Sequence, residues 1–478
     1  FGMESARPAQ LVLIAFLSAT ALLLFVYVRR RVGPWPALLA TVLVLFLGPA
    51  WEVLLWPFEI TLVGAVTFGL AALLALERED RRGDLIALVC LTLAIGFSNL
   101  GVVFVLAAAV AVGVGSREAW LRRSYAFLVP GALFALWYLG WGSDAESHLS
   151  LRNVLASPQS VLDSAAMAVG SLAGLGVDLS DGQIDLTWGR ILLTALVFGI
   201  AYRMLRERSP IERWLWPVAA ALAANWFLTA FNISEGRDPT SSRYQYASCI
   251  LVLMLLAGLF KGVRLGRTGL AALTALTALA VGPNLIQLKN GSHFYEQQSV
   301  LTRAGTAAIE IARDTVDPGL QLSPEVAGTH TLVNVFAGPY LEAADEYGSP
   351  AYTPAELAAA PPEGRRQADV ALAHALGLST VTRPGAFRAR PPRGCVAVAP
   401  GGGPQEGVRL RPGTTRVEVP PGPAAAISLR RFAAGEFPVT APAAPGGSAV
   451  EITVPRDRAP GRPWFLRVEA EQGARVCG

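Results

Sequence analysis

Ten apolar runs follow one another through the first 285 residues of the chain, separated by short polar stretches. A helix that crosses a bilayer needs about 20 mainly apolar residues. These runs therefore predict an α-helical polytopic membrane domain with about ten spans. The fourth and fifth runs are short and meet at Ser98-Asn99, which indicates a tight hairpin. The expected spans are 9–28, 35–50, 59–76, 84–97, 101–115, 124–141, 188–205, 213–230, 243–260 and 267–284.

The stretch 142–187 has a mixed pattern. Its central part, 154–175, is apolar but is interrupted by Pro158, Asp163 and several Gly and Ser residues. A helix with both apolar and polar faces lies at a membrane interface more readily than across it. We therefore expect an interfacial or re-entrant helix here, and not an eleventh span.

Beyond residue 285 the pattern changes to helical segments, and from about residue 393 to short β-type runs divided by Pro and Gly. Short strands separated by turn residues indicate a small β-sandwich. The expected helices lie at about 299–314, 340–347 and 366–376, and the expected strands include 395–398, 415–419, 426–429, 449–454 and 464–468. The expected organisation is a membrane domain at 1–289, a mixed α/β linker region at 290–392 and a β-sandwich-like module at 393–478.

The composition agrees with this division. Of the 478 residues, 53% are hydrophobic and 16% are charged, whereas soluble domains carry about 25% charged residues. The deficit of charge lies almost entirely in 9–284. The net charge is +4, and no basic face is interleaved with aromatic residues, so we expect no nucleic-acid partner.

The distribution of Lys and Arg predicts the orientation in the membrane. One alternating set of loops contains sixteen of them, and the other set contains five. Cytoplasmic loops are the ones enriched in Lys and Arg. The segment 232–246 and everything after about residue 285 are therefore expected outside the cytoplasm. The N-terminal end is also expected outside, which favours a natural protein that begins with one more span. The five basic residues in the less basic set of loops are Arg7, Arg152, Arg190, Arg237 and Arg243.

The polar segment 232–246 lies between two apolar runs and is the first candidate site. Arg237 and Arg243 are placed against the charge bias, and a guanidinium matches phosphate oxygens with two parallel hydrogen bonds. Tyr244 lies beside Arg243 at the start of a helix. We expect these three residues to bind a lipid phosphate. The alternatives are snorkelling to headgroups and an ion pair with Glu235 or Asp238.

Other candidates lie in the remaining outer loops. A carboxylate at the mouth of an apolar helix, Glu52 or Glu59, is a candidate general base, or it only marks the interface. Trp56 is a candidate for stacking on a sugar, although interfacial belts also place Trp there. Asn99 either forms a hairpin turn or contacts a ligand. Among the acids of the long loop 142–187, Asp144 is the candidate for binding the sugar or the acceptor.

Cysteine and histidine usage adds little catalytic signal. Cys395 and Cys477 bracket the β-rich part on the expected oxidising side, so we expect a disulfide between them. Cys90 and Cys249 fall inside expected helices. None of the four histidines is spaced for a metal site, so no cofactor is expected, with a divalent metal as the open alternative.

Four segments of the membrane domain carry a resemblance to a known group of proteins. They resemble actinobacterial membrane glycosyltransferases of the GT-C type, which include polyprenyl-phosphate-mannose-dependent mannosyltransferases. The resemblance covers about 9–284. It implies eleven or more spans, a sugar donor linked to a lipid phosphate, transfer on the outer face and often a soluble outer domain at the C-terminus. The segments are Trp56-Pro-Phe-Glu-Ile60, Phe97-Ser-Asn-Leu-Gly101, Ala135-Leu-Trp-Tyr-Leu-Gly-Trp141 and Asp238-Pro-Thr-Ser-Ser-Arg-Tyr-Gln-Tyr246.

One feature of that group is missing from this chain. The resemblance implies a catalytic acid in the first outer loop, just after the first span, and that region would precede Phe1. We therefore expect an N-terminally truncated transferase whose catalytic residues are unknown, and the resemblance gives no catalytic role to Glu52 or Glu59.

These patterns favour a multi-pass cell-membrane glycosyltransferase-like protein with an extracytoplasmic C-terminal domain. It would move a hexosyl or pentosyl group from a polyprenyl-phosphate donor to a cell-wall glycan or lipid acceptor in the cell envelope. The alternative is a non-catalytic envelope scaffold or transporter with a glycan-binding outer domain. Transporters often have charges within their helices or matching broken spans, and neither pattern is evident here.

Overall fold

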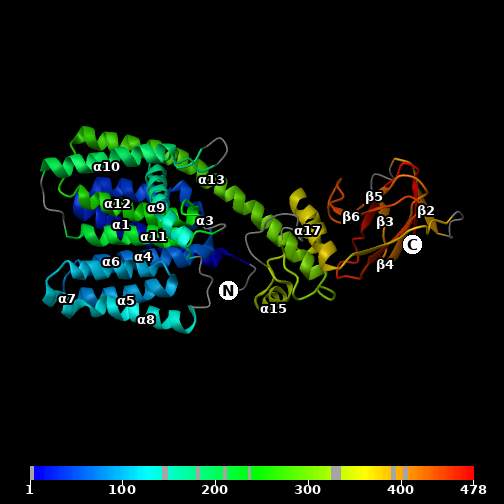
Figure 1. The fold of residues 1–478 in the computed structure, drawn as a ribbon, viewed down its shortest axis with the longest axis horizontal. Helices are drawn as coiled ribbons and strands as arrows, with labels where there is room; N and C mark the ends of the chain where they lie inside the picture. Colours follow the sequence, from blue (N-terminus) through cyan, green and yellow to red (C-terminus); the bar gives the residue numbers. More distant parts are fainter. Residues whose placement is uncertain are drawn as a thin grey trace. The chain divides into compact units, whose positions relative to one another are not determined.

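The structure is a computed structural model. It describes residues 5–142, 149–178, 183–207, 213–234, 238–323, 335–388, 394–401 and 407–478. The chain divides into two compact units, the first at Ala6–His293 and the second at Phe294–Gly478, with Ser5 grouped with the second. The first unit is helical, and the second combines helices with antiparallel sheets (Figure 1).

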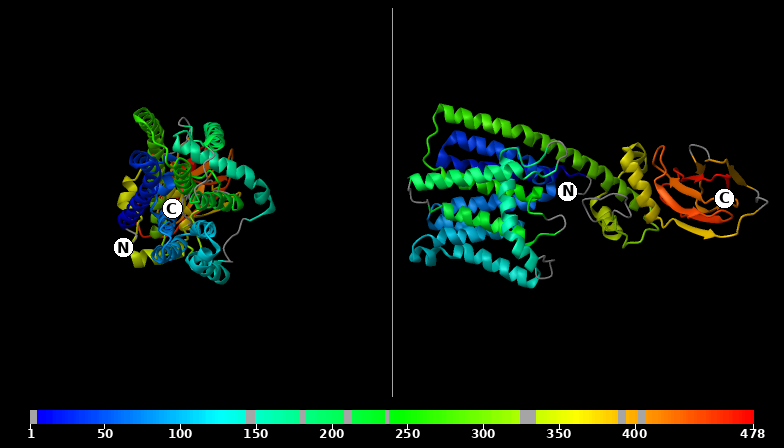
Figure 2. Two further views of the ribbon diagram at one scale, coloured as in Figure 1. Left: turned by 90° about the vertical axis from the view of Figure 1, so that its left-hand side faces the viewer. Right: turned by 45° about the horizontal axis from the view of Figure 1, so that its top comes forward.

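The first unit contains helical structure at each of the ten apolar runs. Most of its helices run side by side, while α9 is steeply inclined to them (Figures 1 and 2). Helix α9 covers most of the stretch 154–175, for which a helix of mixed polarity was expected. The helices are α1 Arg7–Val32, α2 Pro34–Leu45, η1 Gly48–Ala50, α3 Trp51–Leu55, η2 Pro57–Glu59, α4 Ile60–Leu76, α5 Arg81–Phe97, α6 Gly101–Gly113, α7 Arg117–Arg123, α8 Tyr125–Gly140, α9 Leu151–Leu172, α10 Thr187–Glu207, α11 Leu215–Phe231, α12 Ser242–Leu259 and the first part of α13 Arg267–Ile311, whose last part belongs to the second unit.

Helix length gives a smaller number of candidate spans than the ten apolar runs. Among the described residues, five helices are long and apolar enough to cross a membrane, or six if the bent pair 34–45 and 48–55 is one span. Helices α6, α8 and α11 are apolar but shorter. The second apolar run is divided because Pro49 lacks a backbone N–H and does not continue the hydrogen bonding of α2.

Helix α13 differs from the expectation of separate helices at 267–284 and 299–314. It continues for 45 residues and includes Pro283 and the polar stretch between the two predicted segments. A change from apolar to polar side chains does not by itself end a helix, because the backbone hydrogen bonds do not depend on it. Asn284 next to this proline is fully buried; its amide donates to the Ser171 carbonyl (3.2 Å) and accepts from the Gly48 N–H (3.1 Å).

Small and hydroxyl residues allow the helices of this unit to pack closely. The hydroxyls of Thr20 on α1 and Thr67 on α4 share a buried hydrogen bond of 2.6 Å. A Cβ atom added to Gly69 on α4 would lie 2.2 Å from the ring of Phe104 on α6, so only glycine fits at that crossing. Small residues have the same role in packed membrane helices in general.

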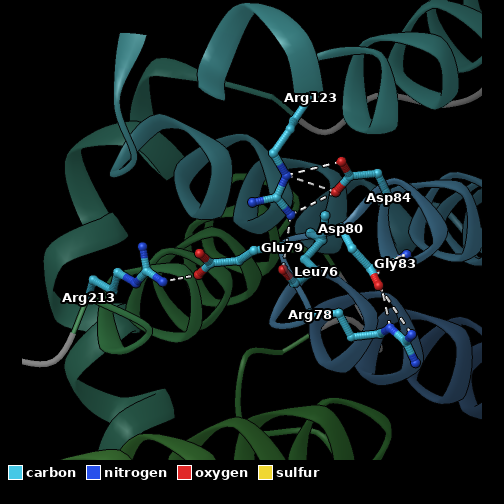
Figure 3. A network of polar contacts seen from close by, with 8 residues as sticks. All are labelled: Leu76, Arg78, Glu79, Asp80, Gly83, Asp84, Arg123 and Arg213. Carbon is cyan, nitrogen blue, oxygen red and sulfur yellow. Dashed lines mark hydrogen bonds and ion pairs between the residues drawn. The ribbon is translucent and has the colours of Figure 1, made fainter. Parts of the chain in front are cut away.

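The basic loops meet at one end of the unit. Figure 3 shows the α4–α5 connection, where Arg123 binds Asp84 through two nitrogens (2.8 and 2.7 Å) and also donates to the Leu76 carbonyl (3.0 Å). Arg213, before α11, pairs with Glu79 of the same connection. Arg31 at the end of α1 pairs with Glu77 at 2.5 Å, and its carbonyl accepts from Gly262 N. The loops that are rich in Lys and Arg therefore form one face of the unit.

The second unit has nine described strands in two antiparallel sheets, with strand orders β1-β7-β4-β9-β2 and β3-β8-β5-β6. Residues of both sheets and of the preceding helices belong to one hydrophobic core. The helices are α15 Ala337–Tyr347, α16 Pro354–Ala359 and α17 Pro362–Ala375. The strands are β1 Ser379–Arg383, β2 Cys395–Val398, β3 Val408–Arg409, β4 Gly413–Glu418, β5 Ala425–Arg430, β6 Val439–Ala444, β7 Ala449–Val454, β8 Phe465–Glu469 and β9 Ala474–Cys477.

One disulfide and a group of three hydrogen bonds join parts of this unit that are distant in the chain. Cys395 in β2 and Cys477 in β9 are paired across the ladder and form a disulfide. Asp369 in α17 accepts hydrogen bonds from the backbone N–H groups of Arg431, Phe432 and Ala433 after β5, at 2.8, 2.8 and 3.0 Å. The expected linker region 290–392 and the expected module 393–478 are therefore joined by buried contacts in one compact unit.

Candidate functional site

A cavity of about 550 Å³ lies in the helical unit among α4, the α5–α6 turn, α8, α11 and α12. It has apolar and aromatic walls with several amide and hydroxyl groups, the mixture that is typical of ligand sites. Its described lining residues are Leu62, Ser98, Asn99, Leu100, Val102, Phe134, Trp137, Tyr138, Gly142, Leu149, Asn225, Leu228, Thr229, Phe231, Asn232, Arg243, Tyr244 and Ala247.

Arg243 brings positive charge to this cavity from the first turn of α12. Its Nε lies 3.4 Å from Oε2 of Glu52, and about a third of its side chain is exposed. The pair is close enough for Coulombic attraction but lacks hydrogen-bond geometry. Ser242 fixes the two elements to each other, because its hydroxyl accepts from the backbone N–H of Glu52 at 3.1 Å. Arg243 therefore pairs with Glu52. Of the two acids that the sequence offered as alternative partners, Asp238 forms no ion pair with it among the described residues, and Glu235 lies outside them.

Glu59 belongs to the same electrostatic group, but it is buried and does not line the cavity. Arg243 and Glu52 both act on its carboxyl group through Coulombic interactions. The structure thus brings together three residues that the sequence singled out separately: the guanidinium of Arg243 and the carboxyl groups of Glu52 and Glu59. Among the described residues that line the cavity, there is no acidic residue beside Arg243.

The polar turn before α12 is held by its own side chains. Oδ1 of Asp238 accepts from the backbone N–H of Thr240 (2.8 Å) and from its hydroxyl (2.5 Å). Gln245 is fully buried and donates to the carbonyl of Pro239 (3.3 Å). Such side-chain bonds to nearby backbone stabilise turns. They orient the first turn of α12 and hence Arg243.

Aromatic residues of α8 form part of the cavity wall. Phe134 packs against Trp137 and Tyr138, with ring centroids 5.8 and 6.2 Å apart. Trp137 and Tyr138 are nearly half exposed. Asn99 lies at the adjacent α5–α6 turn, where its carbonyl accepts from Val102 N and its side chain lines the cavity. Aromatic faces beside an amide are suited to the apolar faces and hydroxyls of a sugar ring.

The polar residues that α11 contributes to the cavity were not among the residues predicted from the sequence. Asn225 is buried. Its side-chain amide donates to the hydroxyl of Ser248 (3.1 Å), and its backbone carbonyl accepts from the hydroxyl of Thr229 (2.5 Å). The indole of Trp226 donates to the same Ser248 hydroxyl at 3.2 Å. An amide inside an apolar run is costly in hydrocarbon, so Asn225 carried a signal that could have been used.

The remaining predicted residues are placed as follows. Tyr244 and Asn99 line the cavity with Arg243. Trp56 packs against Phe58, with ring centroids 5.1 Å apart, and is not part of the described lining. Arg237 and Asp144 lie outside the described residues, although Gly142 and Leu149 on either side of Asp144's segment line the cavity.

The chemistry of the cavity follows from its charge. Arg243 is the only ionisable residue with a formal charge at neutral pH among the described lining residues. Since a guanidinium stays protonated, the cavity favours an anionic group near Arg243 and apolar groups along its walls. Across the residues that the structure covers, no group of three or more His, Cys, Asp and Glu is arranged to hold a metal.

Comparisons with known proteins return no family model, no curated protein and no solved structure that matches this chain.

Proposed function

We propose that the helical unit is a membrane-embedded glycosyltransferase-like protein that binds a sugar linked to a polyprenyl phosphate in this cavity. The observation that carries the proposal is Arg243, a cation anchored by Glu52 in the wall of a cavity that is otherwise apolar, aromatic or neutral and polar. In this proposal the phosphate pairs with Arg243, the sugar contacts Asn99 and the aromatic wall, and the prenyl chain follows the apolar helices.

In the transfer step the hydroxyl of an envelope glycan or lipid acceptor attacks the anomeric carbon. The bond from that carbon to the phosphate oxygen breaks, a base takes the hydroxyl proton, and polyprenyl phosphate leaves with the electron pair. Arg243 would stabilise the charge on the leaving phosphate. Glu52 is engaged with Arg243, and Glu59 is buried and does not line the cavity, so Glu52 acts as a positioning residue here and the base is unassigned.

Arg243→Ala should reduce transfer about 100-fold or more, the usual effect of removing one charge-stabilising donor. The assay is transfer of labelled sugar from a polyprenyl-phosphate donor in membranes that contain the full chain. Arg190→Ala is the matched control, because Arg190 pairs with Asp163 on the surface, away from the cavity. Unchanged transfer by Arg243→Ala at normal expression would refute the role.

A second candidate function is a non-catalytic scaffold that binds the same lipid. The observation that favours it is that no carboxylate belongs to the described lining of the cavity, although transfer needs a base. The two functions separate when polyprenyl phosphate binding and transfer are measured on the same preparation. Binding that depends on Arg243 without any transfer would support the scaffold.

A further inference from the structure

A second hollow, which we call the arginine cleft, lies in the C-terminal unit and has a volume of about 400 Å³. It is formed by the end of β3 with Arg409, the β3–β4 connection with Arg411, and the β7–β8 connection with Arg456 and Arg462. Gly413 at the start of β4 pairs with Val454 at the end of β7, and Arg409 in β3 pairs with Phe465 in β8. Strand register therefore places the four arginines at one end of the two sheets.

A buried ion pair forms the base of the cleft. Arg431 binds Asp457 through two parallel hydrogen bonds (2.7 and 2.9 Å) and also donates to the carbonyl of Ala459 (2.7 Å). Both side chains are almost completely buried. Asp457 is the only acid in the described lining, and its charge is already compensated by Arg431.

The other four arginines are exposed, and none of them has an ion pair within the part of the chain that the structure describes. Like charges that are held together without counter-ions repel one another and destabilise the folded state. Such a cluster is retained at low free-energy cost when an anion binds it. Arg409, Arg411, Arg456 and Arg462 thus indicate an anionic ligand.

The wall of the cleft contains a second, independent indication. Trp464 lines it with 2% of its surface exposed, and its indole Nε1–H is buried without an acceptor among the described residues. Buried donors are normally hydrogen-bonded. The backbone carbonyl of Trp464 accepts a hydrogen bond from Leu410 N at 2.8 Å, and this bond joins the β3–β4 and β7–β8 connections. The proline residues of the lining, Pro412, Pro460 and Pro463, restrict the backbone.

We infer that the arginine cleft binds a phosphate-bearing ligand. A phosphoryl group offers up to two negative charges and three strong acceptor oxygens, and it matches the planar fork of arginine with two hydrogen bonds. The phosphate belongs either to a soluble or glycan-borne phosphate or to a lipid headgroup. This site lies in the C-terminal unit, and the inference does not depend on the function proposed for the helical unit.

The test uses the full chain in phosphatidylcholine nanodiscs. Pyrophosphate binding is measured by calorimetry, and lipid binding by co-flotation with phosphatidylglycerol vesicles, with phosphatidylcholine vesicles as the neutral comparison. The double variant Arg409→Gln/Arg456→Gln should weaken binding at least tenfold in the arm in which the wild type binds. Both arginines are exposed, so folding is expected to be retained, and the thermal midpoint verifies this.

Arg366→Gln is the matched control, since Arg366 is an exposed arginine that pairs with Glu436 elsewhere in the same unit. It should leave binding unchanged. Binding of pyrophosphate alone would assign the site to soluble or glycan phosphate, and binding of phosphatidylglycerol vesicles alone to headgroups. No binding in either arm, or equal binding by wild type and the double variant, would overturn the inference.

Discussion

At the scale of single residues, a tyrosine hydroxyl is held against a carboxylate in the C-terminal unit. Tyr340 donates to Oε1 of Glu310 at 2.7 Å, and Ser349 donates to the same oxygen at 2.5 Å. Burial, together with the adjacent carboxylate, raises the pKa of Tyr340 to about 12, although the Ser349 hydroxyl acts in the opposite direction. The folded state therefore holds this proton more tightly than the unfolded chain does.

This contact makes stability depend on pH above the ordinary tyrosine range. Because the folded pKa is raised, the contribution is fully present below about pH 10 and is lost as the pH rises toward 12. We expect the thermal midpoint of the wild type to fall relative to that of Tyr340→Phe between pH 9 and pH 11.5. A constant difference between the two proteins over this interval would contradict the assignment. At pH 8 the variant should be less stable by about 1.5–3 kcal/mol, the contribution of one hydrogen bond to a charged group.

At the scale of helices, a buried ion pair between α7 and α5 lies next to an exposed ion pair of the α4–α5 connection (Figure 3). The side chains of Arg123 and Asp84 are 9% and 5% exposed, whereas those of Arg78 and Asp80 are 53% and 45% exposed. Removal of one member of a buried pair leaves a charge without solvent or partner. An exposed pair is largely compensated by water. The buried pair should therefore hold α7 to the start of α5, and the exposed pair should contribute little.

Arg123→Ala should lower the free energy of unfolding by about 3–5 kcal/mol. Arg78→Ala should lower it by about 0–1 kcal/mol. The full chain is unfolded with denaturant in detergent, and tryptophan fluorescence monitors the transition and gives its midpoint. The comparison is controlled internally, since both changes remove an arginine from the same end of the unit. Equal losses of stability in the two variants would show that burial is not what distinguishes the pairs.

At the scale of the whole molecule, the helical unit has two chemically different ends. Loops rich in Lys and Arg meet at one end through pairs such as Arg31–Glu77 and Arg213–Glu79. The cavity lies at the opposite end, where α5 ends before Asn99 and α12 begins with Arg243 in its first turn. An excess of Lys and Arg marks cytoplasmic loops. We therefore expect the cavity and the C-terminal unit outside the cytoplasm.

Single cysteines test this orientation. Arg82→Cys at the basic end and Glu471→Cys in the β8–β9 turn are both exposed. A membrane-impermeant maleimide applied to intact cells should label Glu471→Cys and leave Arg82→Cys unlabelled until the cells are opened. The unchanged protein is the background control, because Cys249 is buried and Cys90 lies within α5. Labelling of Arg82→Cys alone in intact cells would reverse the proposed topology.

The sequence by itself determined where helices and strands form, because hydrophobic periodicity and turn residues act locally. The run 59–76 became η2 and α4, the expected helix at 366–376 became α17, and the expected strand at 449–454 became β7. Boundaries were less predictable, as the continuous α13 shows. A polar stretch ends a membrane span but not the hydrogen bonding of a helix.

Only the tertiary structure decided which polar groups meet. From the sequence, Glu235 or Asp238 was the alternative ion-pair partner of Arg243, whereas the packing of α3 on α12 places Glu52 beside it. In the same way, strand register brought Arg409 and Arg456 to one cleft. Such contacts join residues far apart in the chain, and a one-residue change of register would separate them. Composition and periodicity carry no information about that choice.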